Sequence, residues 1–381
     1  MTAVVVVGAG PVGLSAALAA AAQGLETVLL EARPRGEARP GSRALFVHRA
    51  TLDRLSGISP GLGEAVAARG LVWTTKRTLW GGRQVYARSY GASVSPPFTS
   101  LPQTVVEDLL REACDRAGVV SVWGDAVVSV SPRRDHRVRV RTASGAAYDA
   151  SYVIAADGAR SPVREQVGVS LEGSTEATEF VVVDVAEGPQ PAPAERVFHY
   201  RHPAADRRNV LLLPFRGGWR VDVQCRPGDD ARRIAGDPAR WLPGVLPQVP
   251  DARVTWVSVY RFQRRIASSF TDATGRVLLA GEAAHLLPPF GARGMNSGIT
   301  DAVEAARAVQ EGNTGEYARR RREAAERNVR AAGAALDHLL ARRPGQRVAQ
   351  RAAAAVAPLW PRAGRWLDAA PYGPRLRSVQ Y

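Results

Sequence analysis

The chain has 381 residues, too many for one simple core and enough for two modest ones. Its composition, 45% hydrophobic and 23% charged residues, is typical of a globular protein. Its formal net charge of +15 comes almost entirely from arginine, because Lys76 is the only lysine, and these arginines are scattered along the chain. A nucleic-acid-binding surface would gather its arginines in a patch with interleaved aromatic residues, so we expect no nucleic-acid partner. The densest run, residues 319–322, is interpreted as the solvated face of a helix.

The two cysteines and the apolar runs restrict the compartment. Cys114 and Cys225 are far apart and lack metal-ligand spacing, so we expect neither a disulfide framework nor a metal site. The alanine-rich run 14–22 follows a strand and a glycine turn and lacks a basic leader, which favours a buried helix over a signal peptide. No apolar run approaches the roughly 20 residues of a membrane span. These features predict a cytoplasmic protein that is not associated with a membrane.

The first motif lies at the start of the chain. Residues 3–7 form an apolar, β-branched run, which predicts a strand buried on both faces. The glycine-rich turn 8–13 (GAGPVG) follows, and then come a predicted helix over 14–23 and a second strand over 27–30 that leads to Glu31. This is G-x-G-x-x-G in the strand–turn–helix setting that binds dinucleotides.

Each residue of this motif has a physical reason. Gly8 allows the tight turn, Gly10 lets a pyrophosphate approach the backbone, and Gly13 lets the helix pack closely on the strand. Glu31 is placed to accept hydrogen bonds from both ribose hydroxyls of an adenosine, and it would repel a 2′-phosphate. The motif therefore indicates FAD or NAD and does not distinguish between them.

Two later segments repeat the pattern of a strand, a glycine turn and an acid. A predicted strand over 152–156 runs into Asp157 and Gly158, and another over 275–280 runs into Gly281 and Glu282. A loop over 286–293 and a helix over about 294–309 follow the second of these turns. Three such turns indicate a ligand longer than the ADP half of a dinucleotide.

The three motifs, in this order, resemble those of the FAD-dependent aromatic hydroxylases, the para-hydroxybenzoate hydroxylase-like flavoprotein monooxygenases. The resemblance covers residues 1–310, and the stretch 288–298 (PPFGARGMNSG) is similar to the subgroup that acts on phenols and aromatic polyketides. It implies an α/β fold with a Rossmann-like FAD-binding domain, a second, mostly antiparallel β-sheet domain for the substrate, and C-terminal helices. The implied ranges are 1–70, 100–175 and 270–315 for the FAD-binding domain, 71–99 and 176–269 for the substrate domain, and 316–381 for the C-terminal helical segment.

The pattern between the second and third motifs agrees with a sheet domain. Five runs read as strands separated by turns: 180–185, 195–200, 210–215, 219–224 and 254–262. The third and fourth runs, joined through Arg216-Gly217-Gly218, predict a β-hairpin. The C-terminal stretch 316–356 has helical spacing, and we expect no appended thioredoxin-like domain.

The resemblance also implies a set of residues that hold FAD. These are Gly8, Gly10, Pro11, Val12, Gly13, Glu31, Ala32, Arg33, Arg43, Gln103, Asp157, Gly158, Gly281, Glu282, Pro288, Gly291, Gly294, Met295 and Asn296. Arg43 is alternatively a surface arginine, and Gln103 alternatively caps its helix. Glu282 replaces the Asp that is usual in the family, a departure that adds one methylene and leaves its effect on FAD binding open.

The implied activity is hydroxylation of a small aromatic or phenolic substrate with O2 and NADPH or NADH, through a flavin C4a-hydroperoxide. Because the flavin carries this chemistry, we expect no catalytic nucleophile, and we interpret His285 as a hydrogen-bonded turn residue. A loop that ends in a helix N-terminus would direct N–H groups at the flavin. The flavin-adjacent residues are Pro288, Phe290, Arg293 and Gly294. The candidates for lining the substrate site are Tyr200, Phe215, Tyr260, Pro288 and Phe290, although core packing explains most aromatic residues equally well.

Two other readings stay open at this point. One is a different FAD oxidoreductase with the same FAD-binding half, such as a reductase or a halogenase, although the halogenase W-x-W-x-I-P signature is absent. The other is a flavin-binding module without turnover. The substrate, the choice between NADH and NADPH, and the state as monomer or homodimer are not specified by the sequence. The arginine-rich composition and the phenol-type loop suggest bacterial secondary metabolism.

Overall fold

The computed structural model describes residues 3–37, 41, 43, 45–90, 97–133, 135–188, 194–249 and 252–373. Its first layer is a five-stranded sheet in the order β17–β11–β1–β2–β7, and all neighbouring strands are parallel. The strands are β1 (Val4–Val7), β2 (Thr27–Glu31), β7 (Val120–Trp123), β11 (Tyr152–Ala155) and β17 (Val277–Leu279). The run of valines forms the central strand β1 because both faces of a parallel sheet are buried.

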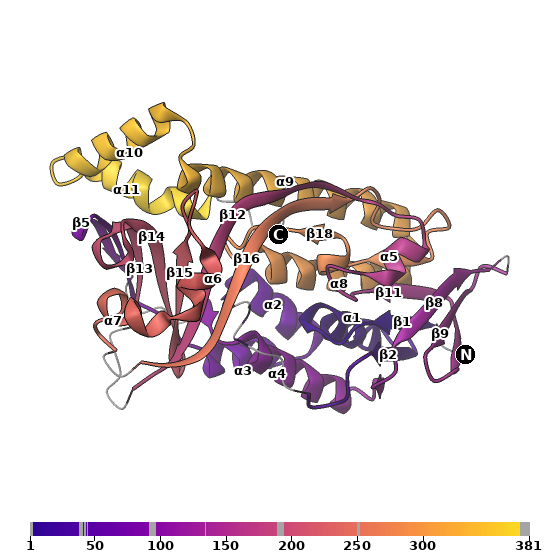
Figure 1. The fold of residues 1–381 in the computed structure, drawn as a ribbon. Coiled ribbons are helices and arrows are strands. Elements are labelled where there is room, and N and C mark those ends of the chain that lie inside the picture. Colours follow the sequence, from indigo (N-terminus) through magenta and orange to yellow (C-terminus); the bar gives the residue numbers. More distant parts are fainter. Residues whose placement is uncertain are drawn as a thin grey trace.

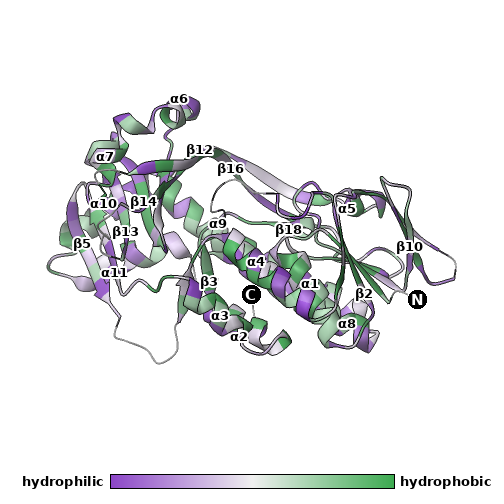
Figure 2. Cartoon of the chain, turned by 90° about the horizontal axis from the view of Figure 1, so that it is seen from below, coloured by the Kyte–Doolittle hydropathy of each residue, from purple (hydrophilic) through white to green (hydrophobic). Residues whose placement is uncertain are grey.

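Helices cover this sheet. Helix α1 (Pro11–Ala22) packs against α4 (Gln103–Arg116) and α8 (Arg293–Glu311), and Figure 2 shows α1 beside α4. Smaller elements surround this layer: α2 (Arg49–Ile58), α3 (Leu62–Arg69), α5 (Pro162–Gln166), the strand pair β3 (Phe46–His48) and β6 (Phe98–Ser100), and the antiparallel β8 (Val127–Pro132), β9 (Val138–Thr142) and β10 (Ala147–Ala150).

The second layer is an eight-stranded sheet in the order β18–β16–β12–β15–β14–β13–β4–β5. Its strands are β4 (Thr75–Trp80), β5 (Arg83–Ser89), β12 (Leu171–Ala186), β13 (Glu195–His202), β14 (Arg208–Phe215), β15 (Gly218–Gln224), β16 (Arg253–Ala267) and β18 (His285–Leu286). Neighbours are antiparallel except β13 and β4, which are parallel. Strands β12 and β16 pair along nearly their whole length and run side by side from this sheet toward the five-stranded one (Figure 1).

Different helices cover the two faces of the large sheet. Short segments pack on one face over Val183, Trp219 and Val221; they are α6 (Ala231–Gly236), α7 (Leu242–Val245) and the 3-10 turns η1 (Pro203–Ala205) and η2 (Pro238–Arg240). On the other face lie α9 (Thr314–Leu340), α10 (Pro344–Val356), α11 (Pro361–Ala369) and η4 (Ala370–Tyr372). Together these layers confirm the predicted α/β fold with a mostly antiparallel second sheet and C-terminal helices. The division into the domain ranges given above stays a prediction.

The predicted hairpin is confirmed, because β14 and β15 pair from Val210 with Val223 to Phe215 with Gly218. The strand pattern of the sequence did not predict the edge of this sheet. There β4 pairs with β13 in parallel, and β5 pairs with β4 as the outermost strand. None of the helices within the described ranges is both long and apolar enough to cross a membrane. Both cysteines are buried and free, and the described His, Cys, Asp and Glu side chains form no group of three suited to a metal ion.

Candidate active site

The turn between β1 and α1 depends on two glycines. Gly8 has φ +97°, and a Cβ there would lie 2.5 Å from the carbonyl oxygen of Ala156. A Cβ at Gly13 would overlap the carbonyl oxygen of Gly8. No larger residue fits either position, so the turn keeps the close approach of helix, strand and backbone that a dinucleotide site needs. Gly10 is the N-cap of α1 and Pro11 its first residue, which leaves the first N–H groups of the helix facing this turn.

Glu31 closes the turn from the neighbouring strand. Its carboxylate accepts hydrogen bonds from the backbone N–H of Ala9 (2.6 Å) and of Arg33 (3.1 Å), and the side chain is buried. The predicted role toward a ribose stays a prediction, but the structure adds a second role, because Glu31 fixes the glycine turn against β2. Ala32 and Arg33, which follow it, are exposed.

The second motif lies next to the first, because β11 pairs with β1 and Asp157 follows β11. Asp157 Oδ2 accepts from the backbone N–H of Val163 (3.1 Å), whereas Oδ1 is buried and has no hydrogen-bond partner. Burial raises the pKa of Asp157, although Ser161 and the Val163 N–H act in the opposite direction. An atom of this kind is suited to accept a hydrogen bond from a bound hydroxyl. Gly158, with φ +88°, faces open space beside it.

The third motif packs directly on the first. A Cβ at Gly281 or at Gly298 would lie 2.8 Å or 2.6 Å from Val12 Cγ2, so Val12 fills the notch that these two glycines leave. Arg164, from the second motif, donates to the carbonyl oxygen of Ala283 (3.2 Å) in the short turn η3 (Gly281–Ala283). The three motifs therefore form one continuous cradle, with Glu282 exposed at its edge.

A buried charge network supports the third motif. Asp301, in α8, accepts from the backbone N–H of Gly281 (3.0 Å) and pairs with His285 Nε2 (2.7 Å) and Arg321 Nε (2.6 Å). Burial raises the pKa of Asp301, but Arg321 and His285 outweigh it and leave the pKa below its usual range. The interpretation of His285 as a hydrogen-bonded residue is thus confirmed, but the residue lies in the short strand β18 and not in a turn. The interpretation of the run 319–322 as a solvated face was wrong for Arg321, which is only 4% exposed because it neutralises Asp301.

The loop before α8 is held by side chains from β3 and α2. Asn296 donates to the carbonyl oxygens of Phe46 (2.8 Å) and Ala292 (2.7 Å) and accepts from His48 N and Thr51 Oγ1. His48 Nε2 also lies 3.0 Å from the carbonyl oxygen of Gly291, and burial lowers the pKa of His48, which keeps the ring neutral. The side chain of Asn296 is thus engaged in the fold, while Gly294, in the first turn of α8, faces open space.

Three other residues from the expected set occupy this region. Arg293 is 2% exposed and donates to Asn328 Oδ1 and to the carbonyl oxygen of Tyr372, both at 3.3 Å, so its charge lies inside the protein. Pro288 is buried and Met295 half-buried.

Two residues expected near FAD, Gln103 and Arg43, lie in the sequence between the first and the second motif. Gln103 starts α4 and donates to Glu107 Oε1 (2.8 Å). Arg43 is exposed, with φ +56°, and its carbonyl oxygen accepts from Arg220 of the large sheet.

The aromatic candidates fall into separate environments. Phe290 contacts Phe180 and Phe262 edge-on, with ring centroids 6.1 and 5.5 Å apart, and so joins the loop before α8 to β12 and β16. Tyr200 is packed in the core, where its hydroxyl contacts His338 Nε2 and Leu367 O, both at 2.8 Å. Tyr260 is largely exposed.

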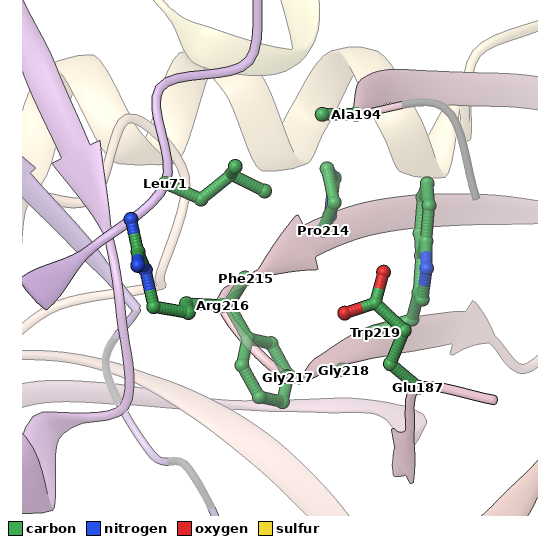
Figure 3. A pocket seen from close by; sticks show the side chains of 9 residues that line it. All are labelled: Leu71, Glu187, Ala194, Pro214, Phe215, Arg216, Gly217, Gly218 and Trp219. Atoms are coloured by element: carbon green, nitrogen blue, oxygen red, sulfur yellow. The ribbon is translucent and has the colours of Figure 1, made fainter. Parts of the chain in front are cut away.

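Phe215 lines a cavity of about 260 Å³ at the turn between β14 and β15. Leu71 and Arg216 lie on one side of this cavity and Glu187 and Trp219 on the other (Figure 3). The cavity lies at the end of the large sheet that contacts α3, since Arg216 donates to the carbonyl oxygen of Gly70 (3.1 Å), the residue that follows α3.

The residues present fit FAD. Gly8 and Gly13 leave no room for a side chain in the turn that leads into α1, Asp157 offers a buried acceptor atom without a partner, and Gly158 and Gly294 face open space. A family model described as an FAD binding domain matches residues 1–337. The chain belongs to this family of FAD-binding flavoproteins.

Several proteins whose names state an activity are similar to this chain. Para-nitrophenol 4-monooxygenase from Pseudomonas sp. (strain WBC-3) is 30% identical over 320 residues, which cover 80% of this chain and 77% of the relative. 6-Methylpretetramide 4-monooxygenase from Streptomyces rimosus is 32% identical over 318 residues, 80% of this chain and 54% of the relative. The crystal structure of p-nitrophenol 4-monooxygenase PnpA from Pseudomonas putida DLL-E4 superposes with a TM-score of 0.78 at 27% identity, covering 99% of both chains. The chain spans about half the length of 6-methylpretetramide 4-monooxygenase and of several other curated relatives that it matches.

The inner face of the large sheet carries a second charge cluster that the sequence did not reveal. Arg220 Nε pairs with Asp184 (3.0 Å) and lies 3.9 Å from Asp222 Oδ1, which has no hydrogen-bond partner. Burial raises the pKa of Asp222 to about 6, with Asp184 adding to the shift and Arg220 opposing it. Only the alternation of β15, which places Arg220, Asp222 and Gln224 on one face, could have indicated this cluster.

We predict that Gly13→Ala weakens FAD binding by at least about 10-fold, which corresponds to about 1.4 kcal/mol, because its methyl group overlaps the Gly8 carbonyl. Titration of the apoprotein with FAD, followed by flavin fluorescence, measures the change, and circular dichroism checks that the fold persists. The matched control is Gly57→Ala in α2, where an added Cβ meets nothing within 4 Å. FAD affinity equal to that of the parent in Gly13→Ala would show that the turn is not the cofactor cradle.

We predict that Asp222→Asn stabilises the protein increasingly as the pH rises. A carboxyl whose pKa is raised in the folded state disfavours folding once it ionises. The free energy of unfolding of the parent therefore falls as the pH rises from the pKa of an unfolded Asp to about pH 6. Between about pH 4.5 and about pH 7.5 the gain should reach about 1–2 kcal/mol, reduced by the quarter of the side chain that remains exposed. Urea unfolding of variant and parent at both pH values measures it.

Asp149→Asn is the control for that measurement. The hydrogen bond from Arg139 lowers the pKa of Asp149, so its contribution to stability is present at neutral pH and lost on acidification. Asp149→Asn should therefore differ from the parent with the opposite sign. A stability difference for Asp222→Asn that does not change with pH contradicts the assigned environment.

Proposed function

We propose that this protein is an FAD-dependent monooxygenase that hydroxylates a small aromatic, phenolic substrate with O2 and NADPH or NADH. The observation that carries the proposal is the continuous three-motif cradle, which is followed by the loop 287–292 and its aromatic contacts with the large sheet. Relatives named as p-nitrophenol and 6-methylpretetramide monooxygenases support both the reaction and the class of substrate.

The residues around the cradle have distinct tasks in this proposal. The N-terminus of α1 and the turn 8–13 bind the pyrophosphate, and Asp157 Oδ1 accepts a hydrogen bond from a hydroxyl of the cofactor. The N-terminus of α8, reached through Gly291 and Gly294, faces the flavin and stabilises negative charge there. When bound, FAD supplies the redox chemistry, taking reducing equivalents from NAD(P)H and activating O2.

The aromatic cluster of Phe180, Phe262 and Phe290 provides an apolar boundary next to this loop. Such a boundary keeps water away from the reacting atoms, and it offers ring edges and faces to an aromatic substrate. The substrate would therefore lie between the large sheet and the loop before α8. We also propose that the protein acts in the cytoplasm, where Cys114 and Cys225 stay reduced, as a monomer or homodimer.

The test is the rate of NAD(P)H oxidation by the FAD-loaded protein in the presence of a panel of phenols and aromatic acids. We expect at least one aromatic compound to accelerate NADPH or NADH oxidation and O2 uptake by about 10-fold or more. With labelled O2, the product should carry one labelled oxygen atom on the ring. The same preparation without FAD is the control.

Two results would contradict the proposal in different ways. NAD(P)H oxidation that proceeds equally fast without any aromatic compound would indicate a reductase or oxidase with the same FAD-binding half. Tight FAD binding without oxidation of either nicotinamide would indicate a binding module.

A further inference from the structure

The helices α10 and α11 carry half of the large hydrophobic side chains that the described part of the chain exposes. The two helices pack against each other, and Figure 1 shows them at the end of the molecule opposite to β1 and β2. Of ten such exposed side chains, five lie in this pair of helices and the connection between them. These five are Val348 (64% exposed), Val356 (40%), Leu359 (91%), Trp360 (55%) and Trp366 (43%).

The inner faces of both helices are already packed against the protein. Gly364 of α11 leaves no room for a side chain, because a Cβ there would lie 2.2 Å from the carbonyl oxygen of Val85 in β5. Leu367 of α11 and Ala354 of α10 are buried, and both belong to one apolar cluster with Phe198 of the large sheet. The exposed hydrophobic residues therefore lie on faces that the described part of the chain leaves open.

The exposed apolar residues of α10 form a stripe along one face of the helix. They occupy positions i, i+4, i+7, i+8 and i+11, which is the spacing of a single helix face. The last position lies just beyond the helix, where Leu359 N donates to the carbonyl oxygen of Val356 (2.9 Å) and so continues the turn. A continuous apolar stripe that faces solvent indicates a surface that is buried by something outside the chain. The members of the stripe are Val348, Ala352, Ala355, Val356 and Leu359, and all of them are exposed.

The surroundings of this stripe are strongly basic. Between Asp337 and Asp368 the chain has six arginines and no acidic residue. Within the described part of the chain, Arg342 pairs with Glu176, and the other five arginines have no carboxylate partner. The six arginines are Arg342, Arg343, Arg347, Arg351, Arg362 and Arg365, and all of them are exposed.

The basic surface continues onto the turn that follows β13. Burial lowers the pKa of Arg201 in this turn, and repulsion from Arg207 and Arg351 lowers it further. Arg351 of α10 therefore lies close to two more cations. Positive charge that is gathered on one side of a protein attracts an anionic surface over distances of up to a Debye length.

The charge and the exposed tryptophans together favour one occupant. Two copies of the chain that met through this face would place arginine opposite arginine, which opposes a homodimer here. Helices that lie in a membrane interface combine arginines with an apolar face that contains Trp and Leu. The Trp ring is favoured at the level of the headgroups because it has an apolar body and a polar N–H. An anionic lipid surface thus satisfies the arginines and the apolar side chains at the same time.

We propose that α10 and α11 dock on the anionic surface of a lipid membrane, with Val356, Leu359 and Trp360 at the acyl boundary and the arginines at the headgroup phosphates. The inference goes beyond the proposed function and does not depend on it, because these helices contain none of the residues assigned to the FAD cradle. The expectation of no membrane association came from the absence of an apolar run long enough to span a bilayer. A helical pair that lies on the surface needs no such run.

The test is co-sedimentation of the FAD-loaded protein with lipid vesicles. One set of vesicles contains phosphatidylcholine alone, and the other contains equal parts of phosphatidylcholine and phosphatidylglycerol. We expect the protein to bind the anionic vesicles at least about 10-fold more tightly than the neutral ones. High salt should largely abolish the difference, because it screens the attraction between arginines and headgroups.

Two combined variants separate the charge from the apolar contact. Arg351→Gln with Arg362→Gln and Arg365→Gln should weaken binding to the anionic vesicles by roughly 100-fold, which is about 5-fold for each charge. Leu359→Ser with Trp360→Ser should weaken it by about 10-fold or more without any change in charge, because two apolar side chains leave the acyl boundary. All five residues are exposed, so the fold and the FAD content should persist, as circular dichroism and flavin absorption would show.

The matched control removes three exposed charges from the other face of the large sheet. It combines Arg232→Gln and Arg233→Gln in α6 with Arg240→Gln in η2, and it should bind the anionic vesicles within about 3-fold of the parent. Equal losses in this control and in the arginine variant of α10 and α11 would show that only the net charge of the protein matters. That result would overturn the inference, as would equal binding to both kinds of vesicle or no binding to either.

Two further measurements distinguish the other occupants. If polyglutamate binds the parent as tightly as the anionic vesicles do, and Leu359→Ser with Trp360→Ser leaves both affinities unchanged, the surface belongs to an acidic protein and the inference is wrong. Light scattering measures the mass of the parent in solution. A dimer that Leu359→Ser with Trp360→Ser converts into monomers would assign the face to a second copy and would also overturn the inference.

Discussion

The buried carboxylate of Asp301 connects the parts of the chain that shape the cradle. It fixes the backbone of Gly281 in the third motif, orients His285 after that motif, and binds Arg321 from the next helix. Because Asp301 is ionised and fully buried, loss of Arg321 would leave a buried charge without a cationic partner, which costs about 3–5 kcal/mol in proteins. The position of α8 follows from this network, and the position of α8 determines where its N-terminus points.

The contacts of Val12 with Gly281 and Gly298 transmit that constraint to the first motif. The glycine turn, the Asp157 turn and the third motif thus share one packed interface and form a single site. The large sheet lies on the other side of the site. Its long strands β12 and β16 pair with each other and run from one layer to the other (Figure 1). The sheet's inner face is far more polar than a core requires, with Asp222 at one position and Arg196 at another, both carrying atoms without partners. Each buried polar atom without a partner calls for an explanation, and a bound ligand is one.

The sequence was most informative where structure is local. The first strand, the glycine turn, α1 and β2 agree with the prediction to within a few residues, because hydrophobic runs and glycines act over short distances. The hairpin of β14 and β15 was predictable for the same reason. Arg321 was misjudged, since a run of four arginines does not indicate which one turns inward toward a partner 20 residues away.

The charge clusters of the large sheet could not be predicted from the sequence. Arg196, Lys76, Asp368 and Tyr372 come from separate segments, and only the parallel pairing of β13 with β4 and the return of α11 bring them together. The charge clusters are therefore the least predictable part of the large sheet, because long-range pairing is not encoded in periodicity.

The measurement that tests the central claim most directly is the visible absorption spectrum of the purified protein before and after reconstitution with FAD. The account predicts flavin absorption bands and binding of one FAD per chain, since the cradle is a single continuous site. A colourless protein that cannot be reconstituted with FAD would contradict the account, and the exposed Glu282 at the edge of the cradle would be the first residue to replace with Asp.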